Sequence, residues 1–112
     1  MQMNTPKIFK DTINNRKERK KLSKLLSELN LIYGEFEILY SLLSNQPLRP
    51  SEIGSHLFCE PAAVSRIIKS LSHKSLINYQ HDDEDRRQIF ISLTKLGETT
   101  ISTVISRSKD GK

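Results

Sequence analysis

The spacing of the apolar residues changes at Ile77, and this change restricts the chain to a small set of folds. Upstream, apolar residues recur at intervals of three and four, which is typical of amphipathic helices. Downstream, apolar and polar residues alternate over 77–81 and again over 88–93, which predicts two strands joined by a charged turn. The 112 residues provide for one compact domain. We therefore expect a single domain, residues 1–112, that is mainly α-helical and carries a small antiparallel β hairpin.

The first predicted helix, at about residues 8–32, has a basic side and an apolar stripe with the spacing i, i+3, i+4 and i+7. The stripe consists of Leu22, Leu25, Leu26 and Leu29. A last helix, at about residues 95–108, is expected to begin after a Thr94 cap. It carries Ile101, Val104 and Ile105 on one side. We expect these two apolar faces to contribute to dimerisation.

Residues 33–94 have the element order of a winged helix-turn-helix. One helix is predicted from about Tyr33 to Ser44, and Pro50 and Pro61 each suit the first turn of a further helix, where the missing N–H has no partner to lose. Gly54 would allow another helix to cross closely. Only a few residues separate the last two helices, as a helix-turn-helix requires.

The helix that begins at Pro61 has a distinctive outward face. Its small and polar residues lie near the amino end, and its cations lie further along. A helix with such a face fits the major groove of DNA, where each base pair shows a distinct pattern of donors and acceptors. The residues predicted to contact DNA from this helix and its end are Pro61, Ala62, Ser65, Arg66, Lys69 and Lys74. Arg66 is the best shaped for a bidentate contact with guanine, and Lys69 and Lys74 are expected to contact phosphates.

The turn between the strands is strongly charged. It contains four consecutive acids, Asp82 to Asp85, followed by Arg86 and Arg87. An extended cationic finger suits the narrow minor groove. The alternative is that these arginines only pair with the neighbouring acids on an exposed hairpin and bind nothing else. The helices upstream favour the DNA role.

Residues Pro47 to Gly97 closely resemble the winged-helix core of the MarR family of bacterial transcription regulators. The resemblance rests on four segments: 61–66 (PAAVSR) on the recognition helix, 71–77 (LSHKSLI) leading into the hairpin, 85–87 (DRR) at the hairpin tip, and 93–97 (LTKLG) after the hairpin. It implies that Arg86 or Arg87 enters the minor groove while Asp85 holds it in position. It also implies a homodimer on a nearly palindromic site, often a repressor released by a small molecule or an oxidant.

The chain also departs from the family pattern at several points. Its carboxy-terminal helical region is short, so the stripe at Leu22 to Leu29 must contribute more to a dimer, or a partner protein must help. Ser75 stands where the family usually has a glycine that ends the helix, and a left-handed backbone would cost serine roughly 1 kcal/mol. Glu60 stands where a small capping residue is usual.

Composition limits the other classes of function. The chain has 18 Lys and Arg against 13 Asp and Glu, which favours polyanionic partners. Cys59 is the only cysteine, which together with the lack of a membrane-length apolar run indicates a cytoplasmic protein, associated with the nucleoid when bound to DNA. His56 and Cys59 lack a second ligand pair for zinc, and Cys59 is interpreted as a small buried hydrophobe.

The sequence contains no recognisable set of catalytic residues, so we predict that the chain is not an enzyme and needs no cofactor. The leading hypothesis is a regulator of transcription that binds double-stranded DNA. The alternative is a truncated winged-helix module that binds another regulator or RNA polymerase.

Overall fold

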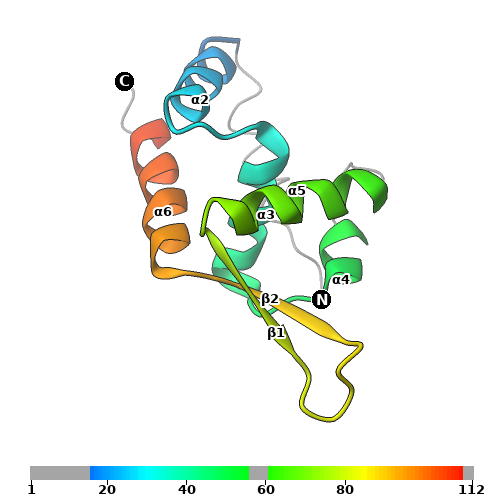
Figure 1. The fold of residues 1–112 in the computed structure, drawn as a ribbon. Helices are drawn as coiled ribbons and strands as arrows, with labels where there is room; N and C mark the ends of the chain where they lie inside the picture. Colours follow the sequence, from blue (N-terminus) through cyan, green and yellow to red (C-terminus); the bar gives the residue numbers. More distant parts are fainter. Residues whose placement is uncertain (1–15, 56–60, 110–112) are drawn as a thin grey trace.

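The computed structural model describes residues 16–55 and 61–109, which form a helical body with a projecting β hairpin (Figure 1). The elements in chain order are α2 (Arg16–Glu28), α3 (Tyr33–Asn45), α4 (Pro50–Ser55), α5 (Pro61–His73), β1 (Ile77–His81), β2 (Ile89–Leu93) and α6 (Lys95–Lys109). The predicted fold class, mainly α with an antiparallel β wing, is confirmed. No helix among the described residues is long and apolar enough to cross a membrane.

Helix α3 lies at the centre of the body because it is apolar on most sides. Phe36, Ile38, Leu39 and Leu42 are each at most 1% exposed. The helix contacts α2, α5, α6 and β2. Helix α5 therefore rests on the buried central helix of the domain.

The hairpin, hereafter the wing (residues 77–93), has the predicted strands. Ile77 pairs with Leu93 and His81 with Ile89 in an antiparallel register. Only Ile77 of β1 is buried, because the strand leaves the body after that residue. At the root of the wing, Leu48 forms a bridge with Ile91, with N–O distances of 3.0 and 2.7 Å. This isolated bridge ties the loop before α4 to the wing.

Two helices end in the same left-handed turn. Asn30 has φ 60° and Ser75 has φ 61°. After α5, the Ser75 N–H donates to the Ser72 carbonyl and the Leu76 N–H to the Leu71 carbonyl, both at 3.0 Å. These are the two bonds of a Schellman motif, which usually places glycine at the left-handed position. The predicted left-handed backbone at Ser75 is confirmed.

Thr94 joins the end of the wing to α6. Its hydroxyl accepts the Gly97 N–H at 2.9 Å and donates to the Ser75 carbonyl at 2.7 Å. The predicted cap is therefore confirmed, with α6 beginning at Lys95. The prediction for Gly54 is corrected: a Cβ there would meet Val64 at an ordinary 3.7 Å, whereas a Cβ at Gly97 would overlap the Leu76 carbonyl oxygen.

Candidate nucleic-acid interface

Helix α5 presents two different faces. Val64, Ile68 and Leu71 are buried in the core. The opposite face is exposed and consists of Ala62, Ser65, Arg66, Lys69 and His73. Pro61 begins the helix, but its side chain lies outside the described residues. The helix face that the sequence analysis predicts to contact DNA is therefore not covered by other described parts of the chain. Two long cationic side chains lie exposed at its centre.

The wing tip is organised by its own acids. Asp85 Oδ1 accepts both the backbone N–H and the Nε–H of Arg87, each at 3.1 Å. Arg87 nevertheless remains 90% exposed, because the contact uses only one edge of the guanidinium. Asp82 Oδ1 accepts the Glu84 N–H at 3.0 Å and so shapes the other half of the turn. An exposed ion pair of this kind contributes little to stability, but it orients the side chain.

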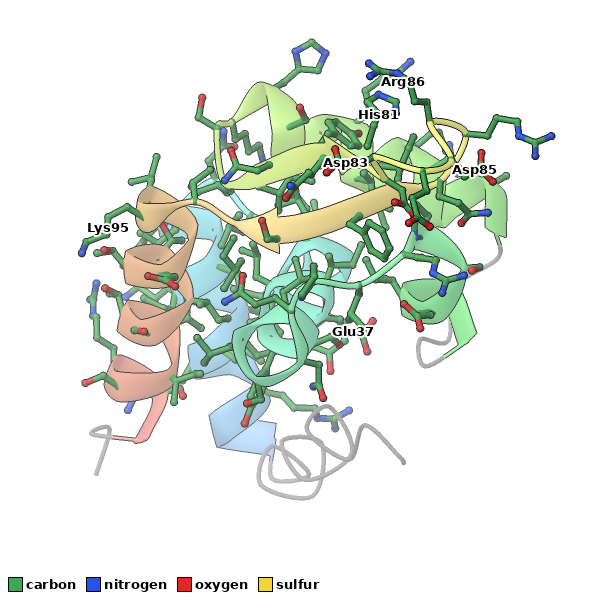
Figure 2. All side chains as sticks on the ribbon, turned by 90° about the horizontal axis from the view of Figure 1, so that it is seen from below. Glu37, His81, Asp83, Asp85, Arg86 and Lys95 are labelled. Carbon is green, nitrogen blue, oxygen red and sulfur yellow. The ribbon has the colours of Figure 1, made fainter. Side chains whose placement is uncertain are left out.

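His81 contributes a contact that the sequence reading did not identify. Its Nδ1 donates to the Arg86 carbonyl at 2.7 Å, across the mouth of the turn. The donor assignment follows because the carbonyl oxygen can only accept. Figure 2 shows His81 and Arg86 side by side at the tip, both pointing away from the body. A histidine at the last position of a strand before a turn is the only sequence signal of this role.

The wing and α5 lie on one side of the molecule. In Figure 2, α5 and the wing lie above α3, and Arg86 and His81 point further to that side. In Figure 1 the wing extends well beyond α5. A helix with an exposed cationic face and an extended arginine-tipped finger therefore lie on the same side of the molecule.

Lys74 has a different environment from that expected of a phosphate contact. Its Nζ donates to Glu35 Oε1 at 2.8 Å and to the Asn30 carbonyl at 2.5 Å. Its side chain is 28% exposed, and Glu35 is 1% exposed. The expectation is revised because two of the three ammonium donors are already used and the charge is balanced by a buried carboxylate.

Glu35 is held in its charged form by this environment. Burial alone would raise the pKa of Glu35, but hydrogen bonds from Lys74, the Ile32 N–H and Ser70 outweigh burial and lower it. The sequence reading missed this residue. Its signal was an acid at the third position of α3, where a glutamate commonly bonds back to the backbone N–H that precedes the helix.

The residues predicted for dimerisation lie mainly inside the single chain. The side chains of Leu22, Leu25, Leu26, Ile101 and Val104 are at most 5% exposed. Leu29 and Ile105 are partly buried against the same core. Because α2 packs on α6 of its own chain, these side chains join the two helices to each other. Their part in a dimer stays a prediction, since the structure shows only how these side chains pack within one chain.

A groove of about 740 Å³ runs along α2 to the start of α3 and the end of α5. Leu26, Ile32, Tyr33 and Lys74 are among its lining residues. The Tyr33 hydroxyl is buried and has no hydrogen-bond partner among the described residues. Burial and the nearby Glu37 charge raise the pKa of Tyr33 to about 12. The groove is therefore apolar with a few polar groups, as small-molecule sites are.

Three residues singled out in the sequence lie where the structure gives no description: His56, Cys59 and Glu60 belong to the segment between α4 and α5. Within residues 16–55 and 61–109, no cluster of three or more His, Cys, Asp or Glu residues is arranged to hold a metal ion.

Comparison with known proteins places this geometry in a family. A family model described as "MarR family" matches residues 31–89. The chain is 27% identical over 84 residues to the organic hydroperoxide resistance transcriptional regulator of Bacillus subtilis, covering 75% of this chain and 57% of the relative. It is 28% identical over 88 residues to the HTH-type transcriptional regulator MgrA of Staphylococcus aureus, covering 79% and 59%. The chain thus spans somewhat more than half the length of these curated relatives.

Solved structures show the same fold. The YusO protein of Bacillus subtilis superposes with a TM-score of 0.78 at 28% identity, over 84% of this chain and 67% of that one. A single-site mutant of MepR from S. aureus, solved bound to an oligodeoxyribonucleotide, superposes with a TM-score of 0.81 over 95% of this chain and 78% of that one. Its identity is 22%, so this second similarity concerns the fold alone.

Proposed function

Because the chain belongs to the MarR family, we propose that it binds double-stranded DNA in a sequence-specific manner and thereby regulates transcription. The observation that carries the proposal is the joint exposure of the α5 face and the arginine-tipped wing on one side of the molecule. The curated relatives are regulators, and a protein of the same fold was solved with an oligodeoxyribonucleotide. No catalytic role is assigned, and the protein would act in the cytoplasm, at the nucleoid.

In this proposal α5 enters the major groove. Arg66 presents a planar guanidinium that suits the O6 and N7 acceptors of guanine, and Ser65 donates to a base edge or a phosphate. Lys69 lies one turn further along the same exposed face and contacts the backbone. Ala62, near the amino end, and Pro61 before it allow close approach.

The wing enters the adjacent minor groove. Arg87 is oriented by Asp85 but exposed, so inserting it would require little rearrangement. Arg86 is exposed beside it, and its backbone is held by His81. One of these two arginines inserts, and the other contacts a phosphate.

The proposed assembly is a homodimer on a nearly palindromic site, with the outward sides of α2 and α6 as contact surface. A small-molecule effector would enter the groove along α2, which lies between the helices near the dimer contact and the end of α5. The alternative of a pure protein-interaction module is not favoured, because it gives no reason for an exposed cationic face and an exposed arginine tip on the same side.

Fluorescence anisotropy on a duplex from the region upstream of its own gene tests the proposal. Arg66→Ala, Arg86→Ala and Arg87→Ala are compared with the natural chain, and Lys95→Ala serves as control because Lys95 is an exposed cation at the start of α6 that points away from the wing tip in Figure 2. We expect Arg66→Ala and at least one wing variant to weaken binding by about tenfold or more, since each bidentate pair is worth about 1–3 kcal/mol. Equal binding by all four variants would refute the assignment.

A further inference from the structure

We propose that Glu35 and Lys74 form a latch that sets the orientation of α5, so that Lys74 acts as a positioning residue and does not contact DNA. The inference rests on the proposed DNA-binding function and concerns how the α5 face is presented. It replaces the phosphate contact expected from the sequence.

The latch joins three elements through one carboxylate. Glu35, at the start of α3, accepts the Ile32 N–H at 3.0 Å and Lys74 Nζ at 2.8 Å through Oε1. Its Oε2 accepts the Ser70 hydroxyl at 2.7 Å. Lys74 also donates to the carbonyl of Asn30, which lies in the turn that follows α2. Both carboxylate oxygens are thus occupied, and the side chain is buried.

The two contacts from α5 fix its rotation as well as its position. Ser70 lies in the last turn of α5, and Lys74 directly follows the helix with its N–H still bonded to the Ser70 carbonyl at 3.1 Å, so the two side chains lie about one turn apart on the same side of the helix axis. A rotation or tilt of α5 would lengthen both hydrogen bonds, and such bonds weaken steeply outside their narrow range of distance and angle. Because Glu35 is buried, breaking the contact would leave an unpaired charge away from water.

The latch lies next to the residues of α5 that are proposed to contact DNA. Lys69 immediately precedes Ser70, and Arg66 lies one turn before that. Bidentate contacts to bases require placement within about 0.5 Å, so a small shift of α5 reduces the affinity for DNA. Loss of Glu35, which touches no part of the exposed α5 face, is therefore expected to weaken DNA binding.

A salt titration separates positioning from direct contact. Each phosphate contact contributes about 0.9 to the slope of log affinity against log salt. We expect Lys74→Met and Glu35→Gln each to weaken binding about tenfold while the slope stays at the natural value. Lys69→Met is the matched control, because it removes an exposed cation from the same helix and should reduce the slope by about 0.9 for each chain bound to the duplex, or about 1.8 for a homodimer. The double variant Glu35→Gln with Lys74→Met should bind no worse than Lys74→Met alone, because the two residues act as one unit.

Amide hydrogen exchange without DNA provides a readout that does not depend on the proposed function. The latch predicts faster exchange over residues 70–76 in Glu35→Gln and Lys74→Met, but not in Lys69→Met. Ser70→Ala, which keeps the ion pair, should show a smaller increase and serves if Glu35→Gln does not fold.

Two results would overturn the latch: a slope reduced by about 0.9 for each bound chain in Lys74→Met with unchanged affinity in Glu35→Gln, or unchanged exchange in the variants. If the natural chain binds no DNA, the proposed function fails, and the exchange measurement still decides whether the latch exists.

Discussion

At the scale of single residues, the left-handed turn at Ser75 shows how the fold restricts which residues suit one position. A helix that must end and lead at once into a strand requires a sharp turn, and only a few residues accept φ near 60° without strain. Serine has a Cβ that crowds the following carbonyl in this conformation. Asn30 adopts the same φ after the end of α2, but asparagine tolerates the region better.

Ser75→Gly is therefore expected to stabilise the protein. Removing the Cβ relieves about 1 kcal/mol of strain, partly offset by the greater freedom of glycine in the unfolded chain, for a net gain of up to about 0.5 kcal/mol in the free energy of unfolding. Urea denaturation measures this change in the free energy of unfolding. Asn30→Gly is the control with matched geometry and should gain less. A loss of stability in Ser75→Gly would mean that the serine side chain makes a compensating contact.

At the scale of elements, the sequence predicts features that repeat locally along the chain, but it does not predict contacts between distant residues. The strands lie at their predicted positions because alternation reports which side of a ribbon faces the body, and the exposed α5 face follows from helical spacing. The Leu48–Ile91 bridge was missed, since a single bridged pair produces no periodicity. The Glu35–Lys74 pair was missed because 39 residues separate its members. The burial of the Leu22 to Leu29 stripe within one chain was likewise undetermined, because an apolar face does not reveal what covers it.

The junction of the wing with α6 provides a prediction at this scale. A Cβ on Gly97 would overlap the Leu76 carbonyl oxygen, which is backbone and cannot move aside cheaply. We expect Gly97→Ala to lower the free energy of unfolding by about 1–3 kcal/mol. Gly54→Ala is the control: its Cβ would find ordinary contact with Val64, and alanine favours helix, so the change should be neutral or stabilising by up to about 1 kcal/mol. Equal effects of both substitutions in thermal unfolding would contradict the close approach.

At the scale of the whole molecule, the buried carboxylate links stability to acid. The pKa of Glu35 is lowered in the folded chain from its usual 4.5, so the unfolded chain takes up a proton at a higher pH than the folded one. The stability due to this group is complete above pH 4.5 and is lost as the pH falls through the lowered folded pKa. Glu35→Gln should be less stable at neutral pH by roughly 1–3 kcal/mol and lose less stability on acidification. Glu98→Gln, at an exposed position on α6, should retain the natural acid profile. Parallel curves of unfolding free energy against pH for the natural chain and Glu35→Gln would contradict this link between Glu35 and acid stability.

Charge also determines how the proposed complex should respond to salt. The formal net charge is +5, but only the cations that face the duplex release counterions on binding. The proposal assigns phosphate contacts to Lys69 and to one of the two wing arginines, so a single chain gives a slope of log affinity against log salt of about −1.8, and two chains on one duplex give about −3.6. Anisotropy titrations between about 50 and 200 mM salt measure the slope, and sedimentation of the same complex counts the chains independently. A slope near −3.6 with one chain per duplex would require phosphate contacts beyond Lys69 and one wing arginine. A slope near zero would show that the exposed cations do not face the nucleic acid at all.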